Sequence, residues 1–167
     1  MLEAFLKSTQ QPADDASEIE RKLAKARELA ENGAMPKSIE LMTEDLAKNP
    51  ALLEDINYIL NIAYKKSLRR LIKLAEEEAS YGDVLAVKII LDKVVDYVGL
   101  AGANINNYES KIRQIKINCY ENAIRQSTDW ISKYGKTDSI LARLKLRLIQ
   151  EYRIKKDNLL DDSVWKS

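Results

Sequence analysis

The sequence contains no histidine, which is the commonest side chain for general acid–base catalysis and a common ligand of zinc. Catalytic devices that pair serine or cysteine with histidine are therefore excluded within this chain. The single cysteine, Cys119, excludes an intramolecular disulfide and leaves a zinc site short of ligands. No phosphate-binding loop of the GxGxxG or GxxxxGK[ST] type is present. We therefore expect a protein that is not an enzyme, with no catalytic residue, no cofactor and no metal site.

Glycine and proline are scarce, with 5 and 3 residues among 167. Because strands need frequent turns, and turns need these residues, so small a number favours long continuous elements. The commonest residues include Leu, Ala, Lys, Glu and Arg, which form helices readily. The sequence therefore predicts an all-α fold.

Long apolar runs and a strong net charge are also missing. The longest run, residues 84–91, is interrupted by Lys88, and a bilayer span needs about 20 apolar residues. The net charge of +1 creates no global field toward nucleic acid or membrane. With no signal-peptide pattern at the N-terminus, we expect a cytoplasmic protein that does not bind membranes. The lack of histidine beside many Ile, Lys and Tyr residues is compatible with a thermophilic source.

Apolar spacing predicts about six helices, over residues 16–32, 36–48, 51–80, 83–98, 107–134 and 138–156. Ser17 and Glu20 form a capping box at the first of them, and Pro36 suits the first position of the second. Asn104 or Asn106 is expected to cap the fifth helix, and Thr137 or Asp138 the sixth. Residues 14–156 are predicted as one domain, preceded by an arm at 1–13 and followed by a tail at 157–167.

The apolar spacing also predicts which helix faces are buried. The fourth helix is apolar on more than one face, so we expect it to lie among other helices. The fifth carries a predicted core stripe that includes the small Cys119, expected to be a buried hydrophobe. The sixth has a predicted core face made of Ile140, Leu141, Leu144, Leu148 and Tyr152.

Three glycines, Gly33, Gly82 and Gly135, stand at similar intervals, each between a preceding helix and a following one. Apolar residues recur at matching distances after them. The pattern predicts three antiparallel helical hairpins that bury their apolar faces against one another. A compact helical bundle is the alternative architecture.

The first hairpin resembles a tetratricopeptide-type repeat in the spacing of its small, apolar and turn residues, which are Ala26, Leu29, Gly33, Ser38, Ile39, Met42, Leu46 and Pro50. The second keeps Ala75, Gly82, Asp83, Val87 and Leu91 of this pattern. The third keeps Gly135, Ile140, Leu144 and Leu148. The third and fifth helices are about two turns longer than that family's helices. The resemblance implies a right-handed stack of hairpins and a role in protein–protein interaction.

The sequence therefore predicts an interaction or scaffold module that binds a protein or peptide. The candidate partner-binding residues are outward aromatic and basic side chains of the long helices, together with a tryptophan of the tail: Tyr58, Lys65, Arg69, Tyr120, Arg125 and Trp165.

Two alternatives come from other features. Basic clusters at residues 65–73 of the third helix and 143–156 of the sixth are typical of a nucleic-acid-associated accessory protein. Ion pairing on a solvated surface is the plainer interpretation of the same residues. The long helices and the tail also fit a self-assembling subunit, such as a homodimer.

Overall fold

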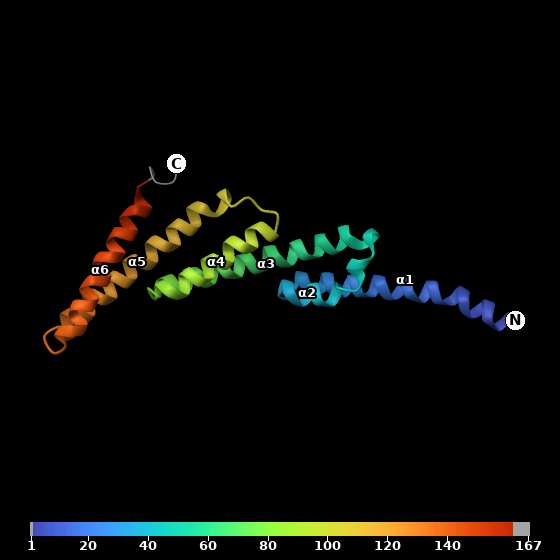
Figure 1. Ribbon diagram of the computed structural model, residues 1–167, viewed down its shortest axis with the longest axis horizontal. Helices are drawn as coiled ribbons and strands as arrows, with labels where there is room; N and C mark the ends of the chain where they lie inside the picture. The colour runs from blue at the N-terminus through green and yellow to red at the C-terminus, as the bar shows by residue number, and fades with distance from the viewer. Residues whose placement is uncertain (1, 162–167) are drawn as a thin grey trace. The chain divides into compact units, whose positions relative to one another are not determined.

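The computed structural model describes residues 2–161, with side chains from residue 17 onward, and it confirms the all-α prediction. This part of the chain contains six α-helices, two short 3₁₀ turns and no strand (Figure 1). It divides into two compact units, an N-terminal unit of residues 2–69 with 100–102 and a C-terminal unit of residues 70–99 with 103–161. The single domain over 14–156 stays a prediction.

The N-terminal unit begins with α1 (Leu2–Glu31), which is much longer than predicted. The predicted arm at 1–13 is helical from residue 2. Ser17 and Glu20, the predicted capping box, therefore lie inside the helix. That prediction was wrong because a capping sequence starts a helix only where the chain before it is not already helical.

The turn from α1 to α2 (Pro36–Thr43) follows the prediction. Gly33 has φ +78°, its N–H donates to the Ala30 carbonyl (3.0 Å), and the Ala34 N–H donates to the Leu29 carbonyl (2.8 Å). This is the Schellman arrangement that favours glycine at the helix end. Pro36 begins α2 as predicted, since its missing N–H is not needed there.

The second helix ends at Thr43 and not at the predicted Lys48. The Thr43 hydroxyl donates to the Ile39 carbonyl (2.9 Å), a back-bond that bends helices. Two 3₁₀ turns follow, η1 (Leu46–Lys48) and η2 (Pro50–Leu52), before α3 (Leu53–Ser80) starts.

The core of the N-terminal unit joins α1, α2 and the first half of α3. Its fully buried residues are Ala26, Ala30, Ile39, Ile59 and Ala63. Three of the five are alanines, which let the helix backbones approach closely. Each buried isoleucine contributes about 1.5–3 kcal/mol relative to an exposed one.

The C-terminal unit consists of the end of α3 with α4 (Val84–Leu100), α5 (Asn106–Tyr134) and α6 (Ser139–Leu160). Gly82 makes the turn between α3 and α4 with φ +67°, and its N–H donates to the Ala79 carbonyl (3.1 Å). The Asp83 carboxylate then accepts the Ala86 N–H (2.9 Å) and caps α4. Asn104 precedes α5, and its side chain accepts the Asn106 N–H (3.0 Å), which confirms Asn104 as a capping residue.

Helices α5 and α6 run side by side, joined by residues 135–138 (Figure 1). Asp138 accepts the Leu141 N–H (2.9 Å) and so caps α6 as predicted. Gly135, in contrast to Gly33 and Gly82, has φ −62°. A side chain there would instead collide with the Ile131 carbonyl oxygen, which lies 2.5 Å from the ideal Cβ position. Helix α6 continues past the predicted end at Lys156 to Leu160.

Two predicted core faces were wrong. Helix α4 buries one face, with Val87, Leu91 and Val94, and leaves Leu85 and Ile89 exposed. The apolar residues of α4 therefore occupy a wider part of its surface than the neighbouring helices bury.

In α6, the predicted core face is exposed, because the helix is rotated about its own axis relative to the prediction. The buried residues are Ala142, Ile149 and Leu159, with Tyr152 half-buried. The predicted Ile140, Leu141, Leu144 and Leu148 are exposed. The helix carries two apolar stripes of the same period, and α5 covers the one built around Ala142 and Ile149.

None of the helices between residues 2 and 161 has a stretch long and apolar enough to cross a membrane.

Candidate functional site

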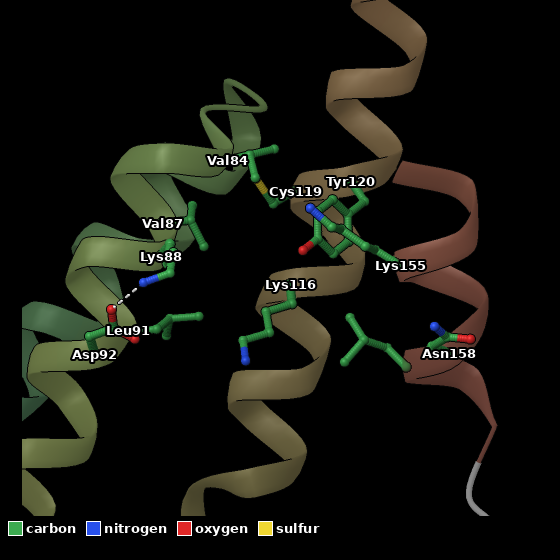
Figure 2. Close-up of a pocket in the computed structure, with 11 residues that line it drawn as sticks. Val84, Val87, Lys88, Leu91, Asp92, Lys116, Cys119, Tyr120, Lys155 and Asn158 are labelled. Carbon is green, nitrogen blue, oxygen red and sulfur yellow. Dashed lines mark hydrogen bonds and ion pairs between the residues drawn. The ribbon is translucent and has the colours of Figure 1, made fainter. Parts of the chain in front are cut away.

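A cavity of about 470 Å³ opens between α4, α5 and α6 in the C-terminal unit (Figure 2). Its apolar lining comes from Val84, Val87 and Leu91 of α4, Cys119 of α5, and Leu159 of α6. Leu159 belongs to the predicted tail, but the structure places it, buried, in the last turn of α6. Apolar side chains from three helices thus meet at one open site.

A second cavity, of about 410 Å³, adjoins the first. Lys116 and Leu159 line both, and the second continues past Ile112 to Ile105 at the start of α5. Together the two cavities form a groove along α5, here called the α5 groove. From Ile105 to Tyr120 a helix rises about 22 Å. The α5 groove is therefore long enough for several residues of another chain.

The charged lining of the α5 groove is mostly basic. Lys88 pairs with Asp92 within α4 (2.8 Å), and Lys155 pairs with Glu151 within α6. Lys116 extends from α5 into the open space beside α4 (Figure 2), and it has no ion-pair or hydrogen-bond partner among the described residues. An unpaired cation within an apolar groove favours a ligand that carries a carboxylate.

Two tyrosines lie at the α6 side of the groove. Tyr120 of α5 stacks on Tyr152 of α6, with ring centroids 5.6 Å apart and planes at 29°. Burial raises the pKa of Tyr120 and that of Tyr152, so both phenols are neutral near pH 7. The pair packs α5 against α6, and the Tyr120 ring lines the groove.

Cys119 is buried at the floor of the groove, which confirms its prediction as a buried hydrophobe. Burial, with a smaller contribution from Asp83, raises the pKa of its thiol to about 11. A thiolate is the nucleophilic form of cysteine, and this thiol is protonated at neutral pH. Cys119 therefore contributes apolar surface to the groove and no nucleophile.

The predicted partner-binding residues fall in different places. Tyr120 lines the α5 groove, as an interaction role requires. Arg125 is exposed on α5, donates to the Asn122 side chain (2.9 Å), and is not among the residues that line the groove. Trp165 lies outside the described residues.

The other three candidates, Tyr58, Lys65 and Arg69, belong to α3 in the N-terminal unit, where their spacing places them on one exposed face. The Arg27 guanidinium lies over the Tyr58 ring, 5.2 Å from its centroid. Tyr58 is therefore already engaged by a cation of its own unit. The two sets of predicted residues belong to different units.

The basic clusters are partly paired. Lys73 lies 3.9 Å from Glu77, and Lys66 donates to the Glu31 carbonyl. In α6, Lys156 pairs with Glu121 of α5 (3.5 Å), and Lys145 lies over the Trp130 ring (5.3 Å). These pairs agree with the plainer interpretation of ion pairing for part of each cluster.

The sequence interpretation missed Lys116, which is one of several lysines along the chain and carries no distinguishing pattern. It also missed Leu159, because the last turn of α6 was assigned to the tail. Leu159 follows the half-buried Tyr152 by seven residues, which returns to the same side of α6, and this spacing was the available signal.

No protein-family model matches the chain, and searches of curated proteins and of solved structures found no significant match. The structure itself shows an all-α protein with a groove between α4, α5 and α6. The resemblance to tetratricopeptide-type hairpins stays a prediction.

Proposed function

We propose that this chain is a non-enzymatic interaction module whose α5 groove binds a short segment of a partner protein. One observation carries the proposal: an open apolar groove built by three helices contains a lysine, Lys116, without a partner among the described residues. Cavities of this size with mostly apolar walls and a few polar groups are typical of binding sites.

The chemistry of the lining supports binding over catalysis. In the larger cavity Asp92 is the one carboxylate among the described residues, and it is paired with Lys88. Proton transfer needs a group whose pKa lies near neutral pH, and the Cys119 thiol, at about 11, is far from it. Apolar contact and charge recognition are the interactions that this lining offers.

The apolar and basic lining of the groove indicates which side chains the partner segment carries. Apolar side chains fill the space beside Val87 and Leu91, and a neighbouring aspartate or glutamate pairs with Lys116. Burying apolar surface contributes about 25 cal/mol per Å², and the carboxylate sets the register of the segment.

Site-specific photo-crosslinking tests this proposal. In the full chain, a photoreactive residue replaces Lys88 or Asn158, which line the groove, or Lys133 or Lys48 at exposed positions outside its lining. We expect both groove positions to capture the same protein from a native extract, and the control positions to capture none of it. Mass spectrometry of the crosslinked peptide is expected to find an acidic residue beside apolar ones.

Equal capture at all four positions, or capture at none, contradicts the proposal. A nucleic-acid adduct or a crosslinked second copy as the main product at the groove positions also contradicts it, and would favour one of the two alternative functions. Far-ultraviolet circular dichroism of each variant establishes that its helices are intact.

A further inference from the structure

Helix α6 carries an apolar stripe that no described part of its own unit covers. Leu141, Leu144 and Leu148 are 37%, 49% and 40% exposed, although all three are leucines on a well-formed helix. Their spacing of three and then four residues is that of a coiled-coil seam. We call these three residues the α6 stripe.

The α6 stripe and the α6 wall of the α5 groove are one face of the same helix. Leu148 and Lys155 are seven residues apart, and Leu159 follows four residues later, which returns to the same side of the helix. Lys155 and Leu159 line the groove. The face therefore continues from Leu141 to Leu159, about 27 Å along the helix axis.

The charge beside the α6 stripe is positive. Arg147 lies at one edge and Lys145, over the Trp130 ring, lies toward the other. Arg147 has no ion-pair partner among the described residues. Glu151, the nearest carboxylate along the helix, is bonded to Lys155.

This charge decides between two occupants of the stripe. A second α6, placed against the first, would bring arginines and lysines of both helices together, and like charges across an interface are unfavourable. An acidic helix would instead place carboxylates against the unpaired Arg147 and the Lys145 ammonium.

We infer that the partner segment is an acidic amphipathic α-helix that lies along α6, with its apolar residues on the α6 stripe and carboxylates facing Lys145 and Arg147. A helix fits because a straight ridge of leucines at seam spacing matches another helix with the same spacing. The inference rests on the proposed function, since the part of the partner helix beside the C-terminal half of α6 would occupy the α5 groove next to Lys116.

The test uses a synthetic peptide of 21 residues with leucine at the two seam positions of each heptad and glutamate at the flanking positions. A matched peptide carries lysine in place of every glutamate. Fluorescence anisotropy measures the binding of each labelled peptide to the full chain in 50 mM and 300 mM salt, at concentrations where the peptide alone is monomeric. We expect the glutamate peptide to bind at least tenfold more tightly than the lysine peptide, and its affinity to fall at the higher salt.

Variants locate the binding surface. We expect the double variant Leu144→Ser/Leu148→Ser to weaken binding of the glutamate peptide at least tenfold. Leu85→Ser/Ile89→Ser, which changes two exposed apolar residues of α4, is the matched control and is expected to leave binding unchanged. Lys145→Glu/Arg147→Glu is expected to reverse the preference, so that the lysine peptide binds more tightly than the glutamate peptide.

Three results would overturn the inference: equal binding of both peptides, no effect of the Leu144/Leu148 double variant, or no reversal by the Lys145/Arg147 double variant. A labelled DNA duplex that binds more tightly than the glutamate peptide also overturns it, in favour of a polyanion site. If position-specific crosslinks from Lys88 and Asn158 persist while the glutamate peptide fails to bind, the acidic helix is wrong and the groove proposal stands. If those crosslinks are absent, the proposed function itself has failed.

Discussion

Gly82, at the turn between α3 and α4, lies directly against the backbone of Ala123 in the middle of α5. A Cβ added to Gly82 would be 2.7 Å from the Ala123 nitrogen, and backbone atoms cannot move aside as a flexible side chain does. Beside this contact the Asn122 side-chain amide donates to the Ala79 carbonyl (3.0 Å). The turn is thus held to α5 by a close approach and a hydrogen bond together.

We expect Gly82→Ala to destabilise the protein by about 2–4 kcal/mol. Part of this is the strain of a side chain at φ +67°, about 1 kcal/mol or more, and the rest is overpacking against Ala123. Urea unfolding followed by circular dichroism measures the change.

Gly102→Ala is the matched control, because Gly102 has φ +60° but nothing within 4 Å of its ideal Cβ position. It should lose about 1 kcal/mol, the strain alone. Equal losses in the two variants would show that the close approach to Ala123 contributes nothing.

The rotation of α6 is tested by exchanging one residue of each stripe for alanine. Ile149 is 5% exposed and packs inside the unit, so Ile149→Ala is expected to lower the free energy of unfolding by about 2–4 kcal/mol. Leu144→Ala, on the exposed stripe, is expected to change it by less than about 1 kcal/mol. Thermal or urea unfolding compares them, and the opposite order would restore the core face expected from the sequence.

The hydroxyl of Tyr64, a buried residue, donates to the part-buried Glu40 carboxylate across 2.6 Å and, more than any other group, lowers the pKa of Glu40 from its usual value of 4.5. Tyr64→Phe is expected to lose about 1.5 kcal/mol at pH 7, as for a hydrogen bond to a charged group. Tyr81→Phe, at an exposed ring, is the control and should be neutral.

The same bond gives a pH dependence of known sign. Because the folded pKa of Glu40 lies below its unfolded value, the stabilisation is fully present above about pH 4.5 and is lost as pH falls through the folded pKa. The difference between the wild type and Tyr64→Phe should therefore shrink between pH 5 and pH 3. A difference independent of pH would contradict the charged hydrogen bond.

Cys119 should react slowly with thiol reagents in the folded protein. A rise of its thiol pKa from 9.0 to about 11 lowers the thiolate fraction at pH 8 by about a hundredfold, before burial reduces access further. A chromogenic disulfide reagent measures the rate, with the unfolded chain in guanidinium chloride as the control. Rapid stoichiometric reaction of the folded protein would contradict the burial of Cys119.

Much of the fold could be predicted from local sequence. Gly33 and Gly82 stand at the turns between helices, Asp138 caps α6, and Cys119 is buried, each as expected. These features depend on the preferences of a few neighbouring residues, which the sequence states directly.

The α6 face and the groove could not be predicted in this way. Leu144 and Ile149 belong to two stripes with the same helical period, and only contact with α5 decides which stripe is buried. The groove lies between α4, α5 and α6, and no local pattern encodes the space that separates these helices. Lys116 is a candidate binding residue only because its side chain extends into this space.

The pairing of Asn122 with Ala79 also sets an order in which the C-terminal unit can form. Helices α5 and α6 meet through a turn of residues 135–138, so their loop closes with little loss of chain entropy. The Asn122 bond instead closes a loop of 43 residues and costs more. During synthesis the turn at Gly82 leaves the ribosome well before Ala123, and it stays uncovered until the middle of α5 has emerged. The nascent chain therefore passes through a stage in which α3 and α4 are complete. At that stage the surface of their turn that later contacts α5 is open to other proteins.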